Sequence, residues 1–247
     1  MNFTLFSKKN ITYTGSQSTA FVAEARQIVG EVTGARITGK AALDTVLFGG
    51  NGVTGVVAML IDCLNLRGLV DESKKRNEVR RRPVVFVGPH EHHSNLLPWR
   101  ESGCEVITIS ERSSDGMVNL DELEQYLRLP QYGASSGRLC MGAFSAVSNV
   151  TGIIADVDAI AVLLHKYGAL AFFDYASGAP YVKMDMNPSP VRFNSMGNSE
   201  EGTVAVDPSK DAIYFSPHKC YGGTSTPGVL VIKKHVSDLT ALVLSIN

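Results

Sequence analysis

The sequence of 247 residues lacks the features that mark several classes of protein. No uncharged apolar stretch reaches transmembrane length, and the apolar run at the N-terminus is too short for a signal peptide. There is no Cys-x-x-Cys pair, which argues against a disulfide scaffold and favours a reducing compartment. The four cysteines are scattered: Cys63, Cys104, Cys140 and Cys220. We therefore expect a cytoplasmic protein that does not bind a membrane.

An excess of charge of one sign is also missing. Lys and Arg number 23 and Asp and Glu number 24, so the net charge is −1. No overall field then favours nucleic acid or an acidic membrane. Residues 74–82 hold six cations and one acid, which we interpret as a solvated connection, with a patch that binds an anion or nucleic acid as the alternative.

What is present is the composition of a globular chain, with 44% hydrophobic and 19% charged residues. The length suits one large domain, or one domain plus part of another. Periodicity predicts helices over 18–33, 53–66, 119–127, 157–167 and 236–245. It predicts strands over 43–48, 83–88, 105–110, 138–147, 169–173, 212–215 and 228–232.

Apolar strands that alternate with helices predict a three-layer α/β/α fold with a mostly parallel sheet. Residues 185–210, rich in Asn, Ser, Pro and Gly, are predicted to form a long surface loop. In sheets of this kind, ligands bind beyond the carboxyl ends of the strands. Several polar residues fall at those ends, which indicates one shared site.

The first candidate is the loop at 50–55 (Gly-Asn-Gly-Val-Thr-Gly), between a predicted strand and a predicted helix. Its backbone N–H groups and the helix dipole suit a phosphate. The loop also matches the G-x-G-x-x-G of NAD(P) sites through Gly50, Gly52 and Gly55. That motif requires an acidic residue at a strand end about 20 positions later, and Asp71 and Glu72 lie in a polar connection. We interpret the loop as a phosphate cradle and keep an NAD(P)-dependent oxidoreductase as an alternative; a tight turn with close helix packing is equally compatible.

The second candidate is His90-Glu91-His92-His93. Three imidazoles this close could bind a metal ion, as in a metallohydrolase. The chain has no second cluster of ligands, however, and we predict no metal. A planar imidazole could instead stack on a flat cofactor ring, and a purely structural role is the alternative.

The third candidate is Asp174, at the end of an apolar strand. Burying a carboxylate is costly unless a cation pairs with it. A protonated ring nitrogen, an arginine or a metal ion would serve, whereas a turn or helix-cap role would need none of them.

The fourth candidate is the segment Ser216-Pro217-His218-Lys219, directly after a predicted strand. The amine of Lys219 is placed to form a Schiff base. The Ser216 hydroxyl and the His218 imidazole could hold a phosphate. An exposed loop lysine is the alternative.

Taken together, five segments resemble the class V aminotransferases, especially the cysteine desulfurase and selenocysteine lyase branch. They are Gly50-Asn51-Gly52, Glu91-His92-His93-Ser94-Asn95, Val147-Ser148-Asn149-Val150-Thr151-Gly152, Asp174-Tyr175-Ala176-Ser177 and Ser216-Pro217-His218-Lys219. These are fold-type-I enzymes that use pyridoxal 5′-phosphate. The resemblance implies an N-terminal segment (1–17), a cofactor-binding large domain (18–235) and the start of a truncated C-terminal region (236–247).

The resemblance also implies roles for single residues. Lys219 would form the Schiff base and shuttle protons, His92 would stack on the pyridine ring, and Asp174 would pair with the ring nitrogen. Asn149 would bond the 3-oxygen of the ring, and Ser177, shorter than the usual Gln, would reach it through a water. The residues implied to hold the phosphate are Asn51, Gly52, Ser216 and His218.

The chain departs from the resemblance in ways that bear on its activity. Gly52 stands where the family has Thr, and no cysteine matches the desulfurase nucleophile. The resemblance implies that this nucleophile and the substrate-binding arginine would follow Asn247. We predict a pyridoxal-phosphate-dependent transferase or lyase that acts on an amino acid as a homodimer, with a catalytically incompetent remnant of the fold as a further alternative.

Overall fold

The computed structural model describes residues 13–40, 42–133, 136–194, 203–221 and 223–236. Its centre is a seven-stranded sheet in the order β1-β9-β8-β5-β4-β2-β3. The strands of this sheet are β1 (Asp44–Gly49), β2 (Val84–Val87), β3 (Glu105–Thr108), β4 (Cys140–Ser145), β5 (Leu170–Asp174), β8 (Ala212–Phe215) and β9 (Gly228–Lys233). Strands β8, β5, β4, β2 and β3 pair in parallel, and β9 runs antiparallel to both β8 and β1. The predicted mostly parallel sheet is confirmed.

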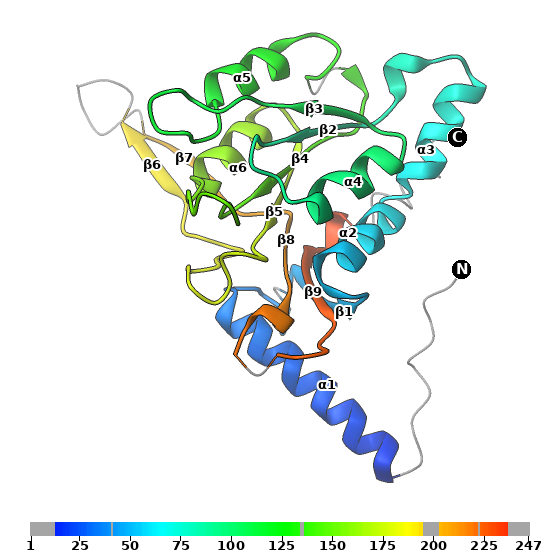
Figure 1. Ribbon diagram of the computed structural model, residues 1–247, viewed down its shortest axis with the longest axis vertical. Coiled ribbons are helices and arrows are strands. Elements are labelled where there is room, and N and C mark those ends of the chain that lie inside the picture. The colour runs from blue at the N-terminus through cyan, green and yellow to red at the C-terminus, as the bar shows by residue number, and fades with distance from the viewer. Residues whose placement is uncertain (1–12, 41, 134–135, 195–202, 222, 237–247) are drawn as a thin grey trace.

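Helices cover both faces of the sheet (Figure 1). They are α1 (Tyr13–Val32), α2 (Gly52–Cys63), α3 (Leu66–Lys75), α4 (His93–Glu101), α5 (Leu120–Arg128) and α6 (Val157–Lys166), with short 3-10 turns η1 (Val79–Arg81) and η4 (Pro217–Lys219). Because successive strand residues point to opposite faces, Phe172 of β5 packs in the core under α2 and α4, and Phe173 packs in the core under α5 and α6. This alternation confirms the three-layer arrangement.

Two predicted helices have different bounds in the structure. The first begins at Tyr13 rather than at 18. The predicted helix over 53–66 ends at Cys63, where Asn65 adopts a left-handed conformation that asparagine tolerates (φ 49°). A separate helix, α3, follows, because Leu66, Val70 and Ser73 recur at helical spacing and are buried. The predicted solvated connection over 74–82 is therefore partly helical.

Two further segments carry structure that the sequence pattern did not reveal. Helix α4 begins directly after His92 and contains Pro98. The predicted loop over 185–210 includes an antiparallel pair, β6 (Val191–Asn194) with β7 (Thr203–Val206), so the prediction of a long surface loop is wrong for these residues. The helix predicted over 236–245 lies outside the described residues after Val236.

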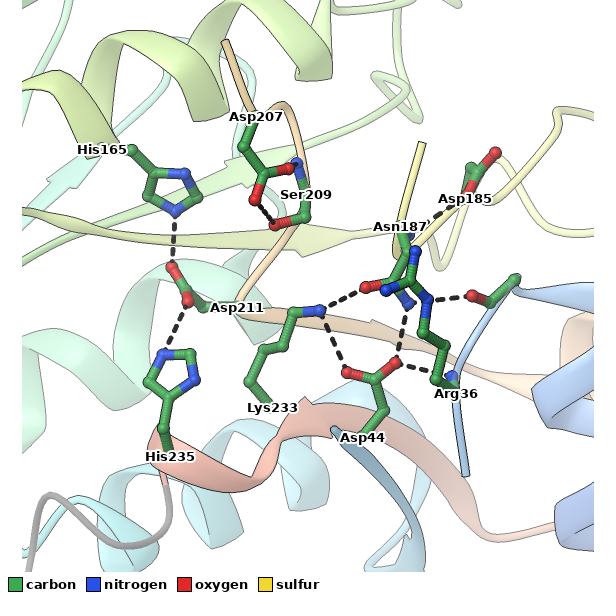
Figure 2. Close-up of polar contacts among 11 residues, drawn as sticks. Arg36, Asp44, His165, Asp185, Asn187, Asp207, Ser209, Asp211, Lys233 and His235 are labelled. Carbon is green, nitrogen blue, oxygen red and sulfur yellow. Dashed lines mark hydrogen bonds and ion pairs between the residues drawn. The ribbon is translucent and has the colours of Figure 1, made fainter. Parts of the chain in front are cut away.

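A buried ion pair joins β1 to β9 at one end of both strands (Figure 2). Asp44 and Lys233 are opposite one another in the ladder, and the Lys233 Nζ lies 3.2 Å from an Asp44 oxygen. Lys233 also donates to the side-chain oxygen of Asn187. The second Asp44 oxygen accepts from Arg36 N (2.7 Å) and Asn187 Nδ2 (2.7 Å). The edge strand β1 is thus tied to the segment that precedes β6.

Within the described residues, no single helix is both long and apolar enough to cross a membrane. Helices α2 and α3 reach that length together, but they are bent by 49° relative to each other. Helix α2 contributes Val56, Val57 and Leu60 to the core. None of the four cysteines forms a disulfide within the part of the chain that the structure describes.

Candidate functional site

A cavity of about 440 Å³ opens at the carboxyl ends of the parallel strands, a volume typical of small-molecule sites. Its lining comes from the loop after β1, the start of α4, the end of β5 and the segments that follow β8. The lining residues are Asn51, Gly52, Val53, Thr54, His92, Ser94, Asp174, Ala176, Ser216, His218, Lys219 and Ser225. Seven of the nine residues predicted for the site are therefore together in one cavity.

The glycine loop packs against the segment that contains Ser216, His218 and Lys219. The Val53 N–H, in the first turn of α2, donates to Ser216 Oγ at 2.9 Å. A Cβ added at Gly52 would lie 2.6 Å from the His218 ring and 2.9 Å from Ser216 Oγ, and Gly52 has a positive φ of 62°. The imidazole and the hydroxyl therefore occupy the space that a larger residue at 52 would need. The hydroxyl, the imidazole and the N-terminus of α2 therefore meet at one end of the cavity, an arrangement that suits an anion.

Asp174 is an acid held inside the protein, with 4% of its surface exposed. Burial raises the pKa of Asp174 to about 7; the hydrogen bond from Ala176 N (2.7 Å) opposes the rise, the Glu91 charge adds to it and the Lys219 charge opposes it. Among the described residues, that N–H is the one hydrogen-bond donor to this carboxylate. A cation in the cavity would therefore stabilise the carboxylate form.

His92 presents a neutral, flat ring to the same cavity. Burial lowers its pKa, and the charges of Lys219 and His93 lower it further. Its Nδ1 accepts from Ser94 N at 3.1 Å, which caps α4 and places the remaining ring proton on Nε2. The Lys219 charge acts on both His92 and Asp174, so these three side chains surround one space.

Asn149 and Ser177 do not line the cavity. Asn149 is exposed in the turn after β4, and Ser177 is partly buried in the turn after β5. Both turns lie at the same edge of the sheet as the cavity. Contacts from these two residues to a ligand remain predictions.

Three hydroxyl groups of the lining were not singled out from the sequence: Thr54, Ser94 and Ser225. Thr54 Oγ1 donates to Ser94 Oγ at 2.8 Å across the cavity wall. Thr54 belongs to the glycine loop and Ser94 follows the histidine pair, so both could have been predicted from their place in these motifs. Ser225, with φ of 63°, had no such signal.

The geometry does not fit the dinucleotide alternative. The strand before the glycine loop, β1, runs antiparallel to β9, so the loop does not belong to a parallel β-α-β unit. Gly50 and Gly55 serve close packing instead, since a Cβ on Gly50 would lie 2.4 Å from the Gly55 Cα. Asp71 lies within α3 rather than at a strand end.

The three histidines at 90, 92 and 93 make different contacts and do not point to one common centre. His90 Nε2 bonds to the Gly116 carbonyl (2.9 Å), and the His92 and His93 rings are 6.3 Å apart and tilted by 48°. Among the described residues, no group of three or more His, Cys, Asp and Glu side chains is placed to hold a metal ion. The metallohydrolase alternative thus has no supporting geometry.

A second, apolar cavity of about 800 Å³ lies between α1 and the end of the sheet. Cys220 lines this cavity, whereas its neighbour Lys219 lines the polar one. The cysteine nearest the site in sequence therefore faces away from it.

The polar cavity fits pyridoxal 5′-phosphate in the chemistry of its groups. The cradle of Gly52, Ser216 and His218 suits a phosphate, and a buried acid with a pKa of about 7 suits a protonated ring nitrogen. A flat neutral imidazole and a primary amine flank the same space.

Comparison with known proteins relates the chain to one family of enzymes. The family model described as aminotransferase class-V matches residues 65–198. The chain is 30% identical over 169 residues to a probable cysteine desulfurase of Halalkalibacterium halodurans, covering 67% of this chain and 35% of that protein. It is 29% identical over 175 residues to a cysteine desulfurase of Synechococcus elongatus, covering 70% of this chain and 24% of that protein. The chain thus spans about a third or less of the length of these relatives.

A solved structure, the apo form of a cysteine desulfurase from Thermococcus onnurineus, superposes with a TM-score of 0.64 at 22% identity. It matches 93% of this chain and 46% of the other. At this identity the superposition shows the fold alone, which is that of fold type I. The family model supplies the sequence relationship, because it covers more than half of the chain. The chain belongs to the class-V aminotransferase family.

Proposed function

We propose that this chain holds pyridoxal 5′-phosphate in the polar cavity and forms the cofactor-binding part of an enzyme that acts on an amino acid. One observation carries the proposal. Residues from four distant segments line a single cavity, with the buried acid Asp174 and the amine of Lys219 both facing it. The family membership of the chain supports this assignment.

Bound pyridoxal phosphate would supply an electron-withdrawing ring that stabilises negative charge on the substrate Cα. The protein would hold the phosphate through the Gly52 cradle, where Ser216 Oγ is oriented by the Val53 N–H. Asp174 would keep a proton on the ring nitrogen, because its burial makes an unpaired carboxylate costly. His92 would fix one face of the ring, and Lys219 Nζ would bond the cofactor and then move protons at the substrate.

The test is titration of the purified chain with pyridoxal phosphate, followed by absorbance and by borohydride reduction. We expect a visible band and, after reduction, a label on the peptide that contains Lys219. Lys219→Ala should remove the label. Lys183→Ala is the matched control, since Lys183 is exposed and lies outside the polar cavity, and it should keep both signals. A wild-type chain that gains neither band nor label would refute the proposal.

The reaction itself is a separate proposal. The relatives above are a probable cysteine desulfurase and a cysteine desulfurase, so cysteine is the first substrate to assay, by formation of alanine and, with a thiol reductant added, by release of sulfide. Cofactor binding with amino-group transfer and no sulfide would favour an aminotransferase. Cofactor binding without turnover of any amino acid would favour the remnant alternative. The proposed homodimer is tested by light scattering at several concentrations.

A further inference from the structure

Glu91, the residue before His92, accepts four hydrogen bonds. One carboxylate oxygen accepts from Gly88 N (3.2 Å) and Ser145 N (2.8 Å). The other accepts from Ser145 Oγ (2.7 Å) and Asn95 Nδ2 (2.6 Å). Burial raises the pKa of Glu91, and these hydrogen bonds oppose the rise because each partner can donate to the carboxylate form. Glu91 therefore joins the ends of β2 and β4 to the first turn of α4.

The side chain of Asn95 continues these contacts into the core. It is fully buried and uses both ends of its amide. Its Nδ2 donates to Glu91 and to the Ala143 carbonyl of β4 (3.3 Å). Its Oδ1 accepts from the Tyr214 hydroxyl (2.6 Å) and the Trp99 indole (3.4 Å). A buried amide with all its partners in place is costly to move, because any shift leaves a polar group unpaired.

Tyr214 extends these contacts to β8, the strand that precedes Ser216 and Lys219 of the cavity lining. It is fully buried in β8, directly opposite Asp174 in the parallel ladder. Its carbonyl accepts from Tyr175 N at 2.8 Å, and Ser216 follows two residues later. The hydroxyl contact thus connects β8, which leads to Lys219, with α4, which His92 caps.

We propose that Glu91, Asn95 and Tyr214 form a hydrogen-bonded brace that sets the position of His92 relative to Asp174 and Lys219. The brace rests on the proposed function, because it orients the groups that would hold the cofactor ring. All three are positioning residues. Because β5 lies between β8 and β4 in the sheet, the side-chain contacts of Asn95 with Ala143 of β4 and Tyr214 of β8 join two strands that share no backbone pairing.

The experiment compares Tyr214→Phe with Tyr132→Phe, a matched control at the far side of the sheet. Tyr132 is also buried, and its hydroxyl donates to Glu105 Oε1 at 2.8 Å. Each variant loses one hydroxyl hydrogen bond. The measurements are thermal unfolding without cofactor, the dissociation constant for pyridoxal phosphate, and the visible circular dichroism of the bound cofactor, which reports ring orientation.

We expect both variants to lose similar stability and Tyr214→Phe alone to bind pyridoxal phosphate roughly fivefold more weakly, with an altered dichroic band. Glu91→Gln should have a larger effect, because an amide would place a donor against donors. In a His92→Ala background, Tyr214→Phe should add little further loss, since the brace acts through His92.

Equal affinity and equal dichroism for Tyr214→Phe and Tyr132→Phe would overturn the brace while leaving the proposed function intact. Full additivity with His92→Ala would overturn it as well. A wild-type chain that binds no pyridoxal phosphate would remove the proposed function and the brace with it. If Tyr214→Phe does not fold, Glu91→Gln is compared with Glu105→Gln by the same measurements, and equal results refute the brace.

Discussion

Replacing Asp174 by asparagine should stabilise the cofactor-free protein at alkaline pH. Burial raises the pKa of Asp174 from 3.8 to about 7, so the folded state binds this proton more tightly than the unfolded chain does. The stability contributed by the neutral acid is complete below pH 3.8 and is lost as the pH rises towards 7. A shift of about three units corresponds to about 4 kcal/mol above pH 7. Asparagine cannot ionise and can still accept from Ala176 N.

The assay is urea unfolding of both proteins without cofactor between pH 5 and pH 8. The difference in the free energy of unfolding, variant minus wild type, should grow by about 2–3 kcal/mol over this range, because part of the change occurs below pH 5. The charges of Glu91 and Lys219 act on Asp174, and both residues are the same in the wild type and the variant. A difference that stays constant across the range would refute the assignment of Asp174 as a buried acid. If a ring cation pairs with Asp174, saturating pyridoxal phosphate should abolish the loss of unfolding free energy that the wild type shows at pH 8.

Two further perturbations test other parts of the structure by urea unfolding. Gly52→Ala should cost about 2–4 kcal/mol, since its Cβ would meet the His218 ring; Gly137→Ala, with φ of 68° and nothing within 4 Å, should cost only the backbone strain of about 1 kcal/mol. Equal losses would contradict the close packing of the cradle. Asp211 bonds to His165 (2.8 Å), and its pKa is lowered to about 2 although burial opposes this. Its stabilisation is therefore complete above pH 3.8 and is lost as the pH falls towards 2, so Asp211→Asn should cost about 2 kcal/mol at pH 7 and less at pH 3; a pH-independent loss would contradict this.

The main elements of the sheet could be predicted from the sequence because the strands are continuous apolar runs. Val84–Val87 is buried on both faces, which needs no alternation and leaves a clear signal. The helices that were missed gave weaker signals. Helix α3 was hidden by its charged exposed side, and α4 by Pro98 and the polar residues that surround it. Their burial depends on strands that lie elsewhere in the sequence.

The site could be predicted to the extent that it follows strand ends. Asp174 ends β5 and Ser216 follows β8, and parallel neighbours bring their carboxyl ends to one edge. That rule does not predict in which direction the chain turns after a strand. Asn149 and Ser177 were placed in the site by their motifs, yet the structure has them outside the cavity lining. The contact of Tyr214 with Asn95 could not be foreseen either, since 119 positions separate them.

The antiparallel pairing of β1 with β9 has a consequence for biosynthesis. Strand β1 leaves the ribosome early, but its ladder partner is made only after all the parallel strands. At 5–20 residues per second, β1 waits roughly 10–40 s with its backbone groups unpaired. During that interval it is an edge open to chaperones or to aggregation, and the Asp44–Lys233 contact can form only when translation has passed β9. Pairing of β1 with β9 can therefore begin only after every parallel strand of the sheet has been synthesised.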